Sequence, residues 1–296
     1  MRRPRARTRA RLIVPELPEV ETVRRGIDRV ALNRRITRVE VGRERTVRRT
    51  SREALIDGLS GVQIVSTRRH GKYLLCDLDS GDAVMIHLRM SGRVLVVDAG
   101  TPRPPHTHVV AHLEATNEFA AGELWFVDPR TFGEVVVFDP EHPEVLVPEL
   151  ARLGPDPLAP GFKPEVLAER LRGKRTNLKA TLLDQGVVAG IGNIYADEIL
   201  HRAKLSPHRT AGSLRRATIE RLHTSIVAVL ERAVEAGGST LTDTQYVDIE
   251  GNEGWFQLEH RVYGRAGESC LTCRRARISR TTLAGRTTCY CGVCQR

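Results

Sequence analysis

The segment PELPEVET (residues 15–22) begins a helix on local physical grounds. Pro18 suits the first helical turn, where its missing backbone N–H is not needed. Glu19 and Glu21 lie where the helix dipole favours acidic side chains. Apolar residues then recur every three or four positions, at Val20, Val23, Ile27 and Val30. The pattern predicts an amphipathic helix on a core, but it does not explain why two carboxylates and a proline crowd its start.

Short runs rich in valine and isoleucine follow this helix, and each predicts a strand. The runs cover residues 37–41, 62–67, 72–77, 83–88, 93–97, 108–113, 123–128 and 134–138. Many short strands at even spacing, with no helix between them, predict a β-sandwich. We expect the first helix to pack at the end or edge of this sandwich.

A proline-rich stretch separates this part from the rest of the chain. Seven of the fifteen prolines fall between Pro140 and Pro164, which predicts an interdomain linker over 140–163. Beyond it the apolar period changes from 2 to 3.6. We expect helices over 164–171, 177–183, 194–201 and 213–236, and a loop over 237–254. The predicted fold class is therefore α+β with more than one domain.

The cysteines gather at the end of the chain, where five of the six lie in the last 27 residues. Cys270 and Cys273, with Cys291 and Cys294, form two CxxC pairs, a spacing typical of a four-thiolate zinc ribbon. A pair of disulfides is the alternative. One structural zinc ion is the expected cofactor, and its thiolates would require a reducing compartment.

The net charge of +10 suggests a polyanionic partner, but its distribution matters. Residues 1–14 hold six arginines and no acidic residue, and without them 40 basic residues face 36 acidic ones. Residues 261–296 carry eight arginines against Glu268 alone, a local footprint for phosphates. The longest apolar runs are too short for a membrane helix, so we expect no membrane contact.

The segment DQGVVAGIGNIYADE (residues 184–198) links two of the expected helices. Its glycines let the backbone approach a ligand, and Asn193 is placed as the cap of the next helix. A helix N-terminus with free N–H groups can bind a phosphate. By itself, however, this pattern fits an ordinary corner between two helices.

Both quoted segments resemble the formamidopyrimidine-DNA glycosylases. PELPEVET is similar to the N-terminus of that family, and residues 184–198 are similar to its helix–two-turn–helix. The resemblance runs from Pro15 to the last residues, with every motif in family order. It implies a catalytic β-sandwich domain with a flanking helix over 15–139, a linker over 140–163, a helix–two-turn–helix domain over 164–260 and a zinc finger over 261–296.

The resemblance also implies roles for individual residues. The free secondary amine of Pro15 would be the nucleophile, Glu16 would transfer a proton at the sugar, and Glu19 would anchor the terminus. Phosphates beside the damaged nucleotide would be held by three residues, and two more would lie close to the DNA. The first three are Lys72, Asn193 and Arg286, and the other two are His106 and Lys179.

Three further residues correspond to the family's wedge, which fills the space left by a flipped base. Taken alone, Met90 and Phe132 would be core residues, whereas the resemblance groups them with Arg130. Two neighbouring positions depart from the family pattern, because Arg89 and Thr131 stand where glycine and a second arginine are expected.

The zinc module departs slightly as well. Seventeen residues separate Cys273 from Cys291, one more than the family spacing. We expect the extra residue to form a bulge within 274–277, and Cys289 to be a fifth thiol that is not a ligand.

The implied function is base-excision repair of double-stranded DNA by a bifunctional glycosylase and abasic-site lyase. The enzyme would excise 8-oxoguanine and formamidopyrimidines through a proline Schiff base and nick the strand by β,δ-elimination. It would act as a monomer in the bacterial cytoplasm, associated with the nucleoid. Two alternatives remain, an endonuclease VIII-like glycosylase for oxidised pyrimidines and a paralogue that binds lesions without cutting them.

The position of Pro15 conflicts with this chemistry, because a proline nitrogen inside a peptide bond cannot form a Schiff base. We therefore expect residues 1–14 to be a non-native extension, with the true start at Val14. Valine can be encoded by GUG, which bacteria use as an initiation codon, and the resulting methionine is readily trimmed before proline. Proteolytic processing and a non-cutting paralogue are the alternatives; a transit peptide fits less well, since the segment is short and has no apolar region.

Overall fold

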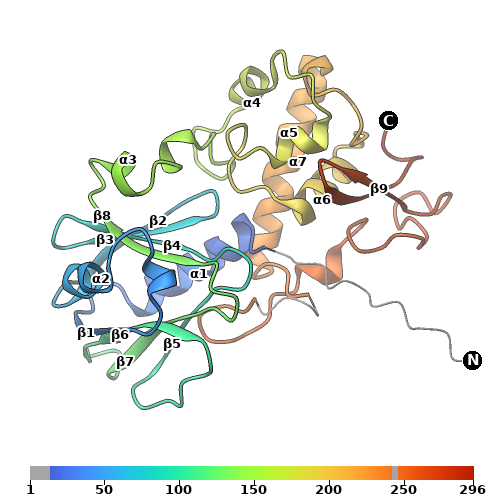
Figure 1. The fold of residues 1–296 in the computed structure, drawn as a ribbon. Coiled ribbons are helices and arrows are strands. Elements are labelled where there is room, and N and C mark those ends of the chain that lie inside the picture. The colour runs from blue at the N-terminus through green and yellow to red at the C-terminus, as the bar shows by residue number, and fades with distance from the viewer. Residues whose placement is uncertain (1–13, 242–245) are drawn as a thin grey trace, which may run out of the picture.

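The computed structural model describes residues 14–241 and 246–296. The expected extension over 1–14 lies outside the described residues except for Val14, so nothing in the structure bears on it. Figure 1 shows a β-sandwich joined to a helical half, with a small two-stranded hairpin at the far side.

The sandwich consists of two four-stranded antiparallel sheets. One has the strand order β1-β6-β7-β5 and the other the order β2-β3-β4-β8. The bounds are β1 Ile36–Val41, β2 Ile64–His70, β3 Tyr73–Leu78, β4 Ala83–His87, β5 Arg93–Asp98, β6 Thr107–Leu113, β7 Gly122–Val127 and β8 Glu134–Phe138. Every predicted strand is therefore present, and alternate buried side chains from both sheets form the core between them.

The expectation that no helix interrupts the strands is wrong. A 3-10 turn, η1 (Glu44–Val47), and a helix, α2 (Arg52–Leu59), lie between β1 and β2. The Ser51 hydroxyl caps α2 by accepting the Ala54 N–H at 3.0 Å. Because only Leu55 and Leu59 of this helix are buried, the apolar pattern is too short to reveal it.

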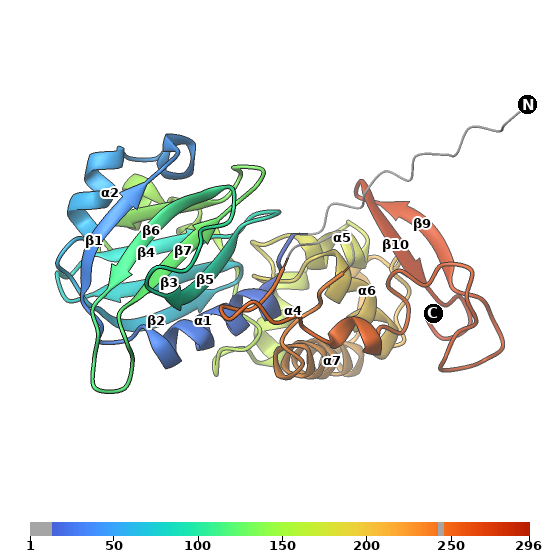
Figure 2. The same ribbon diagram turned by 90° about the horizontal axis from the view of Figure 1, so that it is seen from below.

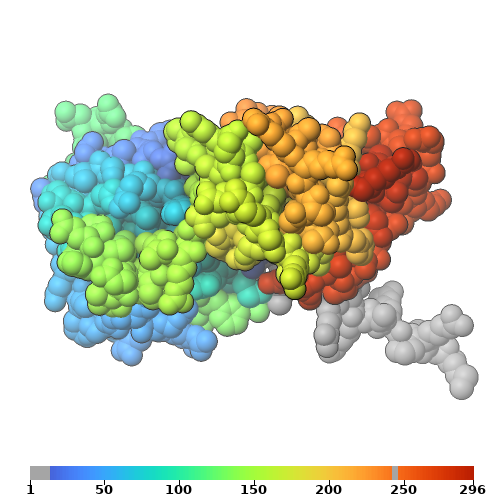
Figure 3. All heavy atoms as spheres, turned by 90° about the horizontal axis from the view of Figure 1, so that it is seen from above, coloured from blue at the N-terminus to red at the C-terminus, as the bar shows by residue number. Residues whose placement is uncertain are grey.

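The proline-rich linker is not a plain extended segment. It contains the short helix α3 (Pro143–Leu146) and a 3-10 turn, η2 (Leu150–Arg152). In Figure 3 this segment, green to yellow-green, runs over the surface from the sandwich to the helical half.

The helical half contains α4 (Pro164–Leu171), α5 (Leu178–Leu183), α6 (Asn193–Arg202) and α7 (Arg216–Glu235), with 3-10 turns η3 (Ala211–Ser213) and η4 (Phe256–Glu259). The four predicted helices are all present. Asn177 caps α5 by accepting the Ala180 N–H at 2.9 Å. The last long helix starts later than expected, because η3 ends at Ser213 and the chain is extended at Leu214 and Arg215.

The first helix, α1 (Leu17–Val30), joins the two halves. Leu17 packs in the helical core, whereas Val20, Val23 and Ile27 pack in the sandwich core. Figure 2 shows α1 between the sheets and the helices, with the hairpin of β9 (Ser279–Leu283) and β10 (Arg286–Tyr290) beyond them. Among the described residues, we find no helix with both the length and the apolar character needed to span a membrane.

Candidate active site and DNA-binding face

A cavity of about 920 Å³ lies between the two halves of the molecule. Residues distant in sequence line it together. They include six of the predicted site residues, Glu16, Lys72, Met90, Phe132, Asn193 and Arg286. The linker contributes Glu149 and Arg152, and the cavity is therefore walled by the sandwich, the linker and the helical half.

Glu16 caps a helix of the opposite half. Its carboxylate accepts the N–H groups of Gly192 at 2.8 Å and of Ile194 at 2.9 Å. Gly192, not Asn193, is the N-cap of α6, so the expected cap assignment is wrong. The Glu16 carboxylate thus binds N–H groups at this helix start that the sequence left available to a phosphate. A Cβ on Gly192 would lie 2.3 Å from Glu16 Cδ, which explains the glycine.

The environment of Glu16 suits proton transfer. Its side chain is buried, and this desolvation raises its pKa to about 7, although the nearby Lys72 ammonium opposes the rise. A carboxyl group with a pKa near the working pH can both donate and accept a proton at an appreciable rate.

Glu19 holds the start of α1 in place. Its carboxylate accepts the Glu16 N–H at 2.9 Å, the Tyr195 hydroxyl at 2.6 Å and the Ser239 N–H at 2.8 Å. Burial raises the pKa of Glu19 above its ordinary value, because desolvation outweighs the opposing effect of these hydrogen bonds. Neither Tyr195 nor Ser239 was predicted as a partner of Glu19. Tyr195 lies within the glycine-rich motif, but nothing in the sequence singles out Ser239.

Pro15 is buried at the beginning of this arrangement. It lines a narrow pocket together with Glu19, Met90, Ser239 and Tyr246. The predicted nucleophile, its anchor and one wedge residue are therefore neighbours.

Lys72 lies in the β2–β3 turn and points toward the glycine-rich loop of residues 186–192. Its Nζ donates to the Ile191 carbonyl at 3.3 Å. Burial lowers its pKa, while the carboxylates of Glu16 and Glu19 raise it and the Arg286 guanidinium lowers it further. This mutual influence places Glu16, Lys72 and Arg286 within one electrostatic environment.

Asn193 lines the same cavity from the first position of α6. Its side-chain Oδ1 is buried and has no hydrogen-bond partner among the described residues. The described part of the protein therefore does not use this acceptor atom.

Lys179, which the resemblance places close to the DNA, is an internal residue in the structure. Lys179 is fully buried, and its Nζ donates to Asp197 Oδ1 at 2.7 Å and to the Thr287 carbonyl at 2.9 Å. The Cys289 N–H donates to the other oxygen of Asp197 at 2.8 Å. Lys179 thus fixes the strand β10, at whose exposed start Arg286 lies.

The expected wedge residues lie on two loops tied to one carboxylate. Asp128 accepts the Ser91 hydroxyl, the Arg130 N–H at 3.1 Å and the Gly133 N–H at 2.7 Å. The Arg130 guanidinium lies 4.8 Å from the centre of the Phe132 ring.

The wedge side chains Met90, Arg130 and Phe132 are half-buried, so Met90 and Phe132 are not ordinary core residues. Arg89 has φ +52°, in the left-handed region that favours the glycine expected at this position. His106 is exposed and also adopts a positive φ, of +70°.

A cysteine cluster closes the chain. The sulfur atoms of Cys270, Cys273, Cys291 and Cys294 lie within 4.8 Å of one another and could bind a metal ion. Cys289 does not belong to this group. The Nε2 atom of His201, which sequence reasoning missed, lies 3.8 Å from Cys270 Sγ. Arg274, in the segment expected to bulge, has φ +55°.

Comparison with known proteins agrees with this geometry. Residues 14–135 match the formamidopyrimidine-DNA glycosylase N-terminal domain, and residues 153–245 match the H2TH domain of the same enzymes. The formamidopyrimidine-DNA glycosylase of Symbiobacterium thermophilum is 46% identical over 283 residues, which cover 95% of this chain and 89% of the relative. The chain belongs to the formamidopyrimidine-DNA glycosylase family.

Solved structures of the glycosylase family superpose over most of the chain. A Lactococcus lactis enzyme bound to abasic-site DNA is 36% identical, with a TM-score of 0.83, and covers 95% of this chain and 99% of that chain. A MutM structure with DNA containing carbocyclic 8-oxo-G is 34% identical, with a TM-score of 0.84, and covers 95% of this chain and 100% of that chain. These glycosylase neighbours are themselves DNA complexes, which supports DNA as the partner of this chain.

Proposed function

We propose that this chain excises oxidised purines from duplex DNA and then cuts the strand at the resulting abasic site. The observation that carries the proposal is the cavity between the two halves, where Glu16, Lys72 and Arg286 converge beside the start of α1. Relatives are named as formamidopyrimidine-DNA glycosylases, and neighbouring structures contain Fapy-dG, 8-oxo-G or abasic-site DNA. The alternatives of a pyrimidine-specific enzyme and a non-cutting paralogue are not favoured by these relatives.

The reaction would begin at Pro15. Its nitrogen attacks C1′ of the sugar, a C–N bond forms, and the bond to the damaged base breaks. Loss of a proton and ring opening give an iminium, which withdraws electrons and acidifies the C2′ hydrogens. Removal of a C2′ proton expels the 3′ phosphate, and removal of the C4′ proton of the resulting conjugated iminium expels the 5′ phosphate. Glu16 is the group placed to move protons at the sugar.

The remaining site residues would bind the DNA. Lys72, Asn193 and Arg286 would hold phosphates beside the lesion, which positions the strand without reading its sequence. Met90, Arg130 and Phe132 would fill the space left by the flipped base, since an apolar surface stacks on bases and a long cation can pair with the orphaned partner. His106 would contact the DNA backbone from its exposed loop.

Borohydride trapping on an 8-oxoguanine duplex tests this proposal. A protein whose first residue is Pro15 has a free secondary amine and is expected to form a covalent adduct. A chain that keeps residues 1–14 holds the same nitrogen in an amide and is expected to bind DNA without trapping. Efficient trapping by a chain shown by intact mass to begin at Met1 would exclude Pro15 and point to a lysine such as Lys72.

For the metal, we propose zinc. Four thiolates in two CxxC turns are the usual donor set of a structural zinc site. Cys270, Cys273, Cys291 and Cys294 would hold the ion, which would fix the hairpin that carries Arg286. Cys289→Ser is expected to keep one zinc per chain, whereas Cys291→Ser is expected to lose the ion and DNA binding together. The opposite pattern of metal content would move the site to Cys289.

We also propose that the enzyme works as a monomer in the bacterial cytoplasm, bound to double-stranded damaged DNA. One chain contains every predicted site residue, and thiolate ligands require reducing conditions. Light scattering of the protein alone and bound to an equimolar duplex tests the monomer; a dimer mass in both samples would contradict it.

A further inference from the structure

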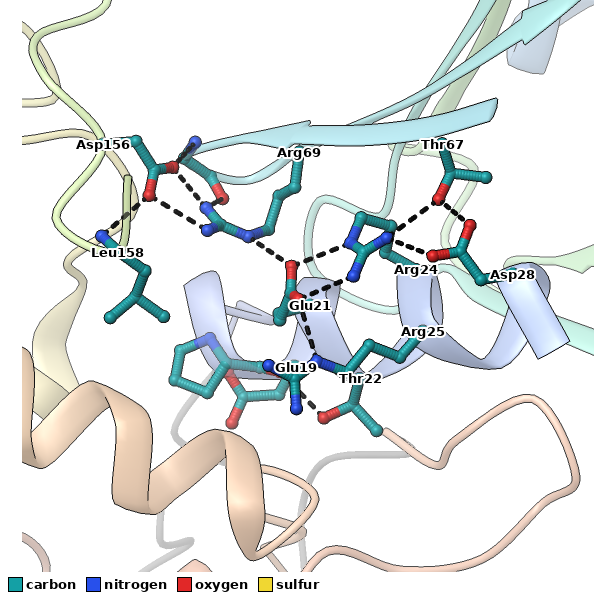
Figure 4. Close-up of polar contacts among 12 residues, drawn as sticks. Glu19, Glu21, Thr22, Arg24, Arg25, Asp28, Thr67, Arg69, Asp156 and Leu158 are labelled. Atoms are coloured by element: carbon teal, nitrogen blue, oxygen red, sulfur yellow. Dashed lines mark hydrogen bonds and ion pairs between the residues drawn. The ribbon is translucent and has the colours of Figure 1, made fainter. Parts of the chain in front are cut away.

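A buried charged network lies where α1, the β2–β3 turn and the linker meet (Figure 4). The Arg69 guanidinium donates from Nε to Glu21 at 3.0 Å and from Nη2 to Asp156 at 3.0 Å. Its Nη1 also bonds Asp156 and donates to the Gly71 carbonyl at 3.1 Å. The three charged side chains are each at most 10% exposed.

The network holds the backbone immediately before Lys72. The Gly71 N–H donates to Asp156 Oδ2 at 2.8 Å, and the Gly71 carbonyl accepts from Arg69. Gly71 has φ +59°, and a Cβ there would lie 2.9 Å from the Cβ of Ala189. Both polar backbone groups of Gly71 are therefore fixed, so the turn has little freedom to move Lys72.

The same network reaches the other two walls of the site. Glu21 lies on α1, the helix whose N-terminal end carries Glu16 and Glu19. Next to Asp156, the Pro155 carbonyl accepts the Ala189 N–H at 3.0 Å, within the loop whose Ile191 carbonyl binds Lys72. One set of contacts thus connects α1, the β2–β3 turn that contains Lys72, and the glycine-rich loop that contains Ile191.

We propose that Asp156, Arg69 and Glu21 are positioning residues that hold the Lys72 amine at the phosphate beside the lesion. The inference rests on the proposed function, because it assumes that Lys72 binds this phosphate. Buried ion networks are costly to desolvate and are weak contributors to stability compared with apolar packing. Precise placement of one cation gives such a network a role that apolar packing could not fill.

Equilibrium binding to a duplex with a tetrahydrofuran abasic analogue tests this inference without requiring a free Pro15 amine. Lys72→Met is expected to weaken binding about tenfold and to reduce the salt slope by about one. Asp156→Asn keeps the shape of the side chain but replaces an acceptor oxygen with a donor. Arg69→Lys keeps the charge but cannot bond Glu21, Asp156 and Gly71 together. Both variants are expected to reproduce most of the loss seen with Lys72→Met.

Combination with Lys72→Met separates positioning from a general weakening of the fold. Adding Lys72→Met to Asp156→Asn or Arg69→Lys is expected to cause little further loss, because the contact is already gone. Arg25→Met is the matched control, since Arg25 also pairs with Glu21, at 2.9 Å, but is not part of the contacts to Asp156 and Gly71. It is expected to bind like the wild type and to add its effect independently to that of Lys72→Met.

Three outcomes would overturn the inference. The first is a fully additive loss of binding affinity in the double variants. The second is a wild-type salt slope in both network variants. The third is that the variants do not stay folded at the assay temperature, which would show that the network serves stability. If the wild type itself does not prefer the tetrahydrofuran duplex over undamaged duplex, both the proposed function and this inference fail. If the wild type prefers the tetrahydrofuran duplex but the losses are additive, the inference fails while the proposed function stands.

Discussion

The start of α1 and the wedge loops are built in opposite ways. At the start of α1, Glu16 and Glu19 bind backbone and side-chain groups that lie 176 to 220 residues away. In the wedge loop of residues 128–133, Asp128 binds N–H groups two and five residues ahead. The first region exists only when both halves of the molecule are assembled, whereas the second is largely a local turn.

The difference matches the proposed tasks. Groups that transfer protons need fixed distances, and buried partners on several segments provide them. A plug that enters a base stack only after the base leaves can be half-exposed and held by one carboxylate. We therefore expect substitutions at the start of α1 to affect both stability and chemistry, and substitutions in the wedge to affect base flipping alone.

Glu19→Ala is expected to have the largest effect. It leaves the buried N–H groups of Glu16 and Ser239 without their acceptor, and each unsatisfied group costs about 1–3 kcal/mol. We expect the free energy of unfolding to fall by roughly 4 kcal/mol and trapping at an abasic site to be lost. Denaturant unfolding and borohydride trapping check this. Tyr195→Phe, which removes only one donor to Glu19, is the milder control, and equal unfolding midpoints for all three proteins would refute the contrast.

Arg130→Ala and Phe132→Ala are expected to have an intermediate effect, confined to intact lesions. Flipping a base costs a few kcal/mol, and about 1.4 kcal/mol corresponds to tenfold in rate. Excision of 8-oxoguanine should therefore slow by about 10- to 100-fold. Cutting at a preformed abasic site, where no base is flipped, should stay nearly unchanged, as should stability. Equal losses on both substrates would show that these residues only maintain the fold.

Titration of Glu16 is expected to change stability gradually with pH rather than in one step. Its pKa is about 7 in the folded protein, against an ordinary 4.5, because it is buried. Its protonated form therefore stabilises the fold fully below about pH 4.5, and this contribution is lost as pH rises through about 7.

The slope for one proton is at most about 1.4 kcal/mol per pH unit. Glu16→Gln cannot ionise, so the stability difference between wild type and variant should change across pH 4.5–7 and then become constant. Parallel stability curves over that range would show that Glu16 does not titrate near neutrality.

Residue patterns were sufficient to predict most of the local elements. Apolar spacing placed α1, every strand of the sandwich and the four main helices, because these patterns repeat every two or every three to four residues. The two CxxC pairs identified the cluster of four cysteines that could bind a metal ion, since each pair lies within one tight turn. Among the described residues, two helices were not predicted: α2, because two buried leucines are too few to form a pattern, and α3, which is only four residues long.

The tertiary structure alone decided which polar groups meet. Nothing near Glu16 in the sequence shows that its carboxylate caps α6. The sequence favours Asn193 as the N-cap, whereas Gly192 holds that position and donates its N–H to Glu16. In the sequence, Lys179 looks like a cation that could bind DNA. In the structure it is buried against Asp197 and stabilises β10, the strand that begins at Arg286. Periodicity records which face of an element is apolar. A hydrogen bond between residues more than a hundred positions apart produces no periodic pattern in the sequence, because either partner alone resembles an ordinary surface residue.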